Sequence, residues 1–278
     1  MEPAAQGDTS CRPGGDALNL GLAGLKALVA GATGGIGRAV ALGLAAEGVR
    51  VVVAARDRGR LERVAGELGS SAAGSVVMDF SDESSITAGV EEAWRLAGGI
   101  DIVVCSVASN TFGSVWDLKR KDWEDLFRIK YMGTVDFSRA AARRMVGQGS
   151  GVIINLIGIA TDVLYPTNPA GGDANLAAAR FTQFLAAKVA TAGVRVLGVS
   201  PGFVDGRRLS KFLDAEKANL AATVPLGRIG TPEEMADLVT FLASPRAGYM
   251  TGNIVALDGG VSLHTPPGRP AAVDLPTP

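Results

Sequence analysis

A glycine-rich stretch near the start of the chain has the residue types and spacing to hold an anionic cofactor. It reads Gly31-Ala32-Thr33-Gly34-Gly35-Ile36-Gly37 and follows an apolar run from Lys26 to Ala30. Glycine has no Cβ, so the backbone can turn tightly and approach a pyrophosphate, and the free N–H groups of a helix start attract the anion. Glycines can also serve only a turn or helix packing. A cluster between a predicted strand and a predicted helix favours dinucleotide binding. The contacts expected from it are Gly31, Thr33, Gly35, Ile36 and Gly37.

The end of the second apolar run bears on the type of dinucleotide. An acidic residue there accepts hydrogen bonds from the ribose 2′-hydroxyl of NAD and repels a 2′-phosphate. This chain has Ala55 and then Arg56 at that place. A guanidinium pairs well with phosphate, although Arg56 can also be read as a solvated surface arginine. We therefore expect NADP(H) in preference to NAD(H).

Seven short runs rich in Val, Ile and Ala alternate with helix-like stretches, such as that from Gly37 to Gly48. This alternation predicts βαβ units and a parallel sheet covered on both faces. The segments 1–19 and 264–278 are rich in Gly, Pro and polar residues, so we expect two poorly ordered tails around one domain, 20–263. The predicted strands are 26–30, 50–55, 75–78, 100–106, 151–157, 194–200 and 253–257.

Composition excludes several classes of function. The 278 residues include 27 basic and 28 acidic side chains, so no net field draws the chain to nucleic acid or an anionic membrane. A small-molecule substrate is the expected partner. Cys11 and Cys105 do not make a disulfide framework, and one histidine, His264, makes neither a metal cluster nor a histidine triad, so no metal is expected. No export signal or membrane-spanning run is seen, and we expect a cytoplasmic protein.

Residues 24 to 262 closely resemble the short-chain dehydrogenase/reductase family. Ala30 and the glycine-rich turn are similar to the family's TGxxxGxG, and Asp79 matches its adenine-contacting aspartate. Ser200-Pro201-Gly202-Phe203-Val204 resembles the segment along the nicotinamide, although Gly206 stands where Thr is usual. The stretch ending in Asp258-Gly259-Gly260 follows the family pattern most specifically. The resemblance implies an α/β Rossmann fold with a doubly wound seven-stranded parallel sheet, a homotetramer or homodimer, and further cofactor contacts from Arg56, Asp79, Phe80, Ser106, Pro201, Gly202 and Val204.

The same resemblance implies that the family's four catalytic side chains are missing. Lys130 stands at the position of the catalytic Asn and Gly158 at that of the Ser. Thirteen positions beyond Gly158, where the Tyr belongs, is Gly171, and four further on, where the Lys belongs, is Asn175. The downstream run from Phe181 to Ala186 anchors this register. General acid–base help is typically worth about 10²- to 10⁴-fold in rate, so hydride transfer by the usual route should be severely slowed.

Replacement groups are the expected catalytic residues: Lys130, Asp173 and Asn175. Lys130 can act as an acid or as a structural ammonium that neutralises a carboxylate. Asp173 and Asn175 can hydrogen-bond a ligand or cap a helix that starts there. Tyr165 can be a relocated proton donor or a residue of a covering loop.

These residues leave three readings of function open. The first is an NADP(H)-binding oxidoreductase of atypical mechanism that acts on a small carbonyl or alcohol. The second is non-redox work, as a lyase, an isomerase or a ligand-binding pseudoenzyme, since function resides in the site and not in the fold. The third is a structural subunit beside an active relative. Arg207, Arg208 and Lys211 could receive an acidic substrate or form a solvated face.

Overall fold

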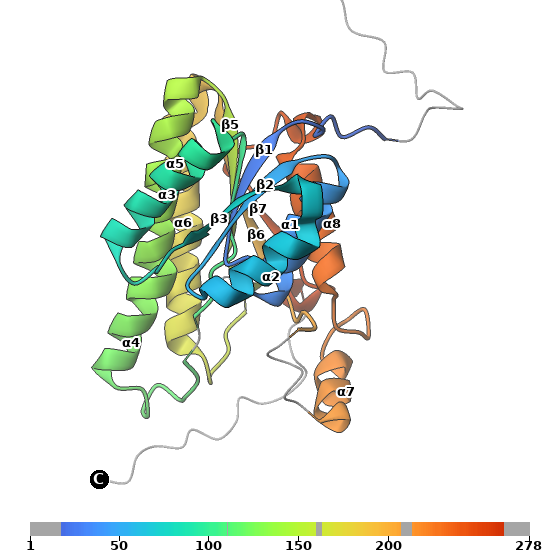
Figure 1. Ribbon diagram of the computed structural model, residues 1–278. Helices are drawn as coiled ribbons and strands as arrows, with labels where there is room; N and C mark the ends of the chain where they lie inside the picture. The colour runs from blue at the N-terminus through green and yellow to red at the C-terminus, as the bar shows by residue number, and fades with distance from the viewer. Residues whose placement is uncertain (1–17, 110, 160–162, 207–212, 264–278) are drawn as a thin grey trace, which may run out of the picture.

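The sheet has the predicted parallel architecture. The computed structural model describes residues 18–109, 111–159, 163–206 and 213–263 (Figure 1). Seven parallel strands lie in the order β3-β2-β1-β4-β5-β6-β7, so the chain starts in the middle of the sheet and winds outward in both directions. The strands are β1 (Lys26–Ala30), β2 (Arg50–Ala55), β3 (Ala72–Val77), β4 (Ile102–Cys105), β5 (Gly151–Leu156), β6 (Val194–Pro201) and β7 (Ile254–Leu257).

Helices cover both faces of this sheet, which confirms the doubly wound fold. In Figure 1, α1, α2 and α8 lie on one side and α3, α5 and α6 on the other. A π-helical segment, Phe127–Met132, joins α4 to α5. No helix of the described residues has the length and apolar character to cross a bilayer. The helices are α1 (Gly35–Ala46), α2 (Arg58–Leu68), α3 (Glu83–Ala97), α4 (Arg120–Leu126), α5 (Gly133–Gln148), α6 (Pro169–Val189), α7 (Asp214–Ala222) and α8 (Pro232–Ala243).

The central strands read as continuous apolar runs because each face of the sheet has its own core. In β1, Ala27 and Val29 pack into the cluster under α1 and α8, whereas Leu28 and Ala30 pack into the cluster under α3 and α5. Side chains alternate between the faces of a strand, so every residue of such a run is buried. Because the buried strands are parallel, the loops after β1, β2, β4, β5 and β6 all lie at the same edge of the sheet.

The helix starts differ in a way that matters for the site. Asp57 caps α2 by accepting a hydrogen bond from the Arg60 N–H at 2.9 Å, and Thr231 caps α8 in the same manner. Gly34 is the N-cap of α1, and no side chain in the described chain caps that helix. The free N–H groups at the start of α1 therefore remain available to an anion.

Candidate cofactor and ligand site

The glycine-rich turn is closed so tightly that two of its positions exclude a side chain. Gly31 has φ +76°, and a Cβ there would lie 2.6 Å from the carbonyl carbon of Ser106. A Cβ at Gly37 would lie 2.8 Å from the carbonyl carbon of Gly31. Both contacts are with backbone, which cannot rotate away as a side chain can. The turn thus has the compact form that close approach to a pyrophosphate requires.

The first turn of α1 also has the electrostatics of an anion site. It contains no acidic residue, and the positive end of the helix dipole is exposed at Gly34 and Gly35. Gly35 faces the segment after β6, since a Cβ on it would lie 3.8 Å from the Cα of Gly206. Thr33 and Ile36 are half-buried in the same turn. These residues fit the pyrophosphate of a dinucleotide.

The residues predicted for the adenosine half follow β2 and β3 at the same edge of the sheet. Arg56 is exposed directly after β2. The Asp79 carboxylate accepts hydrogen bonds from the N–H and hydroxyl of Ser81, both at 2.9 Å, which fixes its orientation. The Phe80 ring is buried against Phe137 with centroids 5.3 Å apart. A cofactor contact from Phe80 would therefore come from its backbone.

The segment predicted to lie along the nicotinamide is held by β7 and by the loop before α8. Ser106 extends the pairing of β4 with β1, because its N–H donates to the Ala30 carbonyl at 2.9 Å. Pro201 is the last residue of β6, and the Gly202 N–H donates to the Leu257 carbonyl at 3.0 Å. Val204 makes an isolated parallel bridge with Gly230.

Asp258 reinforces this arrangement. A Cβ at Gly202 would lie 2.6 Å from the Cα of Asp258, so only glycine fits there. The Asp258 carboxylate accepts from the N–H groups of Gly260 and Ser262 at 2.9 and 2.8 Å. Burial acts to raise the pKa of Asp258, but these hydrogen bonds together outweigh it and the pKa is lowered. The turn after β7 is thereby fixed against the loop after β6.

The structure brings Gly158 and Asn175 together. Gly158 has φ +116°, and a Cβ there would lie 3.0 Å from the Nδ2 of Asn175. Asn175 is only 3% exposed, and Gly171 precedes it by one helical turn on the same face of α6. Asp173 is exposed and so lies on a different face. The helix begins at Pro169, so the interpretation of Asp173 and Asn175 as caps is wrong: both lie inside α6.

Lys130 lies in the π-helical segment and is 7% exposed. Its carbonyl accepts a hydrogen bond from the Thr134 hydroxyl at 2.7 Å. The π-helical segment packs against α6, and its Tyr131 contacts the cluster of Ile157 and Ala178. Such segments are frequent at functional sites because the wider turn redirects side chains. Lys130 is thus placed beside the helix that carries Gly171 and Asn175.

Sequence reasoning missed Asn168, which the structure places at the centre of this region. A Cβ at Gly171 would lie 2.6 Å from the Nδ2 and 2.7 Å from the Cγ of Asn168. Asn168 is the N-cap residue of α6 and closes a turn, because its N–H donates to the Tyr165 carbonyl at 2.9 Å. The signal that could have located it is Pro169, since proline favours the first position of a helix and the residue before it is then the cap.

Several polar atoms here are buried and have no hydrogen-bond partner among the described residues. They are the Asn168 Oδ1, the Asn175 Oδ1 and the Tyr165 Oη; Thr240 Oγ1, elsewhere in the fold, is a fourth. The Tyr165 ring packs edge-on against Phe203 at 5.9 Å. Burial, and then the negative charge of Asp258, raise the pKa of Tyr165. Its hydroxyl is therefore neutral at physiological pH.

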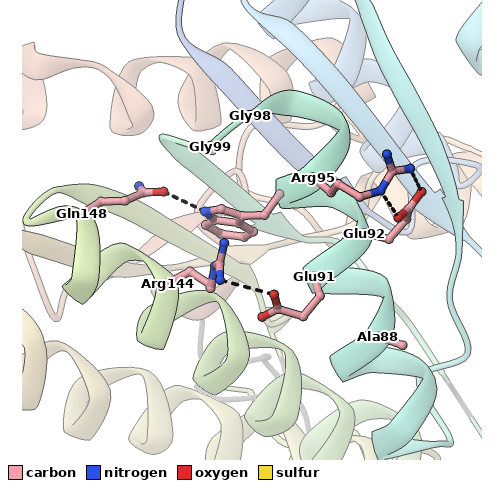
Figure 2. A pocket seen from close by; sticks show the side chains of 9 residues that line it. Ala88, Glu91, Glu92, Arg95, Gly98, Gly99, Arg144 and Gln148 are labelled. Carbon is pink, nitrogen blue, oxygen red and sulfur yellow. Dashed lines mark hydrogen bonds and ion pairs between the residues drawn. The ribbon is translucent and has the colours of Figure 1, made fainter.

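A hollow lies at the opposite edge of the sheet from the glycine-rich turn. It has a volume of about 840 Å³ and runs between α3 and α5 near Gly98 and Gly99, which precede β4 (Figure 2). Its charges are paired with one another, Arg144 with Glu91 at 3.3 Å and Arg95 with Glu92 at 2.6 Å. It shares no residue with the glycine-rich turn. Arg207, Arg208 and Lys211 lie outside the described residues, as do His264 and most of the two predicted tails.

Comparisons with known proteins agree on one family. A family model described as enoyl-(acyl carrier protein) reductase matches residues 31–262. The 3-oxoacyl-[acyl-carrier-protein] reductase of Aquifex aeolicus is 32% identical over 253 residues, covering 88% of this chain and 100% of that protein. Galactitol 2-dehydrogenase (L-tagatose-forming) of Cereibacter sphaeroides is 35% identical over 248 residues, covering 87% and 96%.

Solved structures agree with the sequence matches. A gluconate 5-dehydrogenase from Burkholderia cenocepacia, in complex with NADP and tartrate, superposes with a TM-score of 0.83 at 27% identity. The superposition covers 89% of this chain and 98% of that one. The chain therefore shares its fold, over nearly its whole length, with dehydrogenases and reductases.

Proposed function

Because this chain belongs to the short-chain dehydrogenase/reductase family, we propose that it is an NADP(H)-binding oxidoreductase with an atypical catalytic site that acts on a small carbonyl or alcohol. The observation that carries the proposal is the closed glycine turn at the uncapped start of α1. A nicotinamide cofactor supplies or accepts the hydride in such a reaction. The N–H groups of this turn bind its pyrophosphate.

NADP(H) is the proposed dinucleotide because of Arg56. The chain has no carboxylate at the end of β2 to repel a 2′-phosphate, and the exposed guanidinium of Arg56 can pair with that group. The Burkholderia gluconate 5-dehydrogenase contains NADP, which agrees with this choice. Asp79, held in place by Ser81, contacts the adenine side.

The atypical part of the proposal concerns the proton. Gly158 and Gly171 have no hydroxyl to give or take one at the substrate oxygen, and Asn175 has no ammonium. Lys130 is the proposed proton donor, because it is buried beside α6 and its ammonium group carries a proton that it can transfer. Asn175 orients the ligand. The exposed Asp173 is the weaker candidate of the three.

Titration of the purified protein with NADPH and NADH tests the cofactor. NADPH should bind more tightly, and Arg56→Ala should weaken NADPH by roughly 10- to 100-fold while leaving NADH unchanged, since a hydrogen bond to a charged group is worth about 1.5–3 kcal/mol. Equal weakening of both dinucleotides would remove Arg56 from the 2′-phosphate site. No binding of either would overturn the proposal.

Turnover is tested separately with NADPH and a panel of small carbonyl compounds. Oxidation of NADPH that falls by about 10²-fold or more in Lys130→Met, with NADPH binding retained, would support Lys130 as the proton donor. Unchanged turnover in that variant would exclude Lys130. The second candidate function is non-redox catalysis or ligand sensing, favoured by the glycines at 158 and 171, and it predicts that NADPH binds and is not oxidised by any compound of the panel.

We also propose, from membership of the family, that the protein is a cytoplasmic homotetramer or homodimer and that 20–263 folds as its single domain. Mass measurement in solution tests the assembly.

A further inference from the structure

We propose that Asn168, Asn175 and Tyr165 form a binding site for a neutral polyhydroxylated ligand, one that offers hydroxyl groups on neighbouring carbons. This inference deepens the proposed function by naming a substrate class, and it rests on that function only in placing the ligand beside the cofactor turn.

An amide group occupies the space left by the missing side chain at 171. The Nδ2 and Cγ of Asn168 would lie 2.6 and 2.7 Å from a Cβ on Gly171, so the whole amide group fills that volume. Gly171 is buried on the inner face of α6. A side chain at 171 and the present position of Asn168 therefore exclude each other. The absence of a side chain at 171 is what brings a polar group from the preceding turn into the site.

Three buried polar atoms of this region lack hydrogen-bond partners among the described residues. Asn175 is only 3% exposed, and its Oδ1 accepts no hydrogen bond from the described residues. The Asn168 Oδ1 and Tyr165 Oη are in the same state. Buried polar groups in folded proteins almost always have partners, so unpaired ones need an explanation. These three come from one short segment, 165–175, which points to a ligand that completes them.

The hydrogen-bonding capacity of these three atoms defines the ligand that would complete them. An amide oxygen only accepts hydrogen bonds, so Asn168 and Asn175 need donors. The Tyr165 hydroxyl, kept neutral by its raised pKa, can both donate and accept. A hydroxyl group meets each of these needs, because it donates to an amide oxygen and accepts from a phenol. A carboxylate ligand offers only acceptors and would face two amide oxygens.

The Tyr165 hydroxyl separates hydroxyl ligands from the other donor-rich class, ammonium ligands. An ammonium group only donates hydrogen bonds, whereas a hydroxyl group also accepts one from the phenol. A polyol or sugar is thus the class that fits all three groups.

The test uses calorimetric titration of the full chain, in the presence and absence of NADPH, with galactitol, erythritol and succinate as probes. Erythritol and succinate have the same number of carbons, so they separate hydroxyl recognition from carboxylate recognition. We expect the polyols to bind with dissociation constants on the order of 1 mM and succinate not to bind. Binding of succinate without binding of either polyol would overturn the proposal.

Matched variants locate the site. Asn168→Asp keeps an acceptor oxygen and should keep polyol affinity within about 3-fold, whereas Asn168→Leu removes the acceptor and should weaken it by about 3- to 10-fold. Gly171→Ala should also weaken binding, since its Cβ displaces the Asn168 amide. Gly66→Ala, at a helical glycine with open space around it, is the control. Equal affinities in Asn168→Asp and Asn168→Leu would refute the assignment.

A stability measurement separates this role from a structural one. An unpaired buried acceptor destabilises the fold, so Asn168→Leu should unfold at the same or a higher denaturant concentration than wild type while it loses polyol binding. Loss of stability together with binding would refute the ligand role. If NADPH fails to bind wild type but the polyols bind, the cofactor proposal fails and this one stands; if NADPH binds and the polyols do not, the reverse holds.

Discussion

Replacing Gly37 by alanine is the perturbation that most directly examines the cofactor turn. Alanine is the better helix former by about 1 kcal/mol, so an ordinary helical position would gain stability. Gly37 is the third residue of α1, but its Cβ would lie 2.8 Å from the carbonyl carbon of Gly31 and closer still to the attached oxygen. Ordinary carbon–carbon contacts are about 3.5–4.0 Å, so the turn must open by roughly 1 Å.

The expected cost follows from what must move. The atoms that the new Cβ meets are all backbone, and overpacking of this kind typically costs about 1–3 kcal/mol. We expect Gly37→Ala to lower the free energy of unfolding by about 1–3 kcal/mol. It should also weaken NADPH binding by about 10-fold or more, because the N–H groups of the turn would no longer point together at the pyrophosphate. Gly66→Ala makes the same chemical change at a helical position with nothing within 4 Å. It should leave stability unchanged or raise it by up to about 1 kcal/mol.

Urea unfolding monitored by circular dichroism measures both variants, and fluorescence titration measures NADPH. Gly37→Ala should lower the unfolding midpoint, whereas Gly66→Ala should leave it unchanged or raise it, and both variants should keep the wild-type slope. If Gly37→Ala is as stable as wild type and binds NADPH equally well, then the turn tolerates a side chain and the reasoning from its closure is wrong.

Three further outcomes are expected. Arg195 donates to the carbonyls of Leu242, Ala243, Ser244 and Ala247 at 3.0–3.3 Å, so Arg195→Met should lower the free energy of unfolding by about 2–4 kcal/mol in urea; a loss below about 1 kcal/mol would contradict this. Burial raises the pKa of Cys105 to about 11, so in a Cys11→Ser background a thiol reagent should label the protein only after unfolding, and labelling of the native protein would refute the burial. The Arg228 guanidinium, with the Thr231 N–H, lowers the pKa of Glu234 from 4.5 to about 2. A lowered folded-state pKa stabilises above pH 4.5 and its contribution disappears as the pH falls toward 2, so the stability difference between wild type and Glu234→Gln, about 0.5–1 kcal/mol after solvent screening, should shrink over that range; a difference that grows on acidification would contradict it.

The fold was predictable because burial on both faces leaves a local trace. Runs such as Val51-Val52-Val53 are apolar at every position, and runs rich in Val, Ile and Ala located all seven strands. The third strand starts at Ala72, earlier than the predicted Ser75. The sequence did not indicate this start, since Ala72-Ala73-Gly74 has weak β propensity. These residues are nevertheless in the strand because they pair with β2. The helix predicted from Gly37 begins at Gly35, a shift within the usual uncertainty of helix ends.

The features of the site likewise divide into those that a local motif predicts and those that depend on tertiary packing. The glycine-rich turn was predictable, since its closure demands glycine at fixed positions of a local motif. Asn168 was not, because its importance depends on an empty volume at Gly171 that only the folded chain reveals. The π-helical segment around Lys130 has no sequence signature either, and the contacts of α4 and α6 with it are tertiary.

The packing of α1 against α8 sets the order in which this protein can mature on the ribosome. Gly43 of α1 lies so near α8 that a Cβ on it would be 3.3 Å from the Cβ of Ala236. That partner is synthesised long after α1, and at translation rates of about 5–20 residues per second the wait is of the order of 10–40 s. Until then the part of α1 that packs on α8 is uncovered, so a nascent chain stalled before α8 should be a substrate for chaperones and proteases.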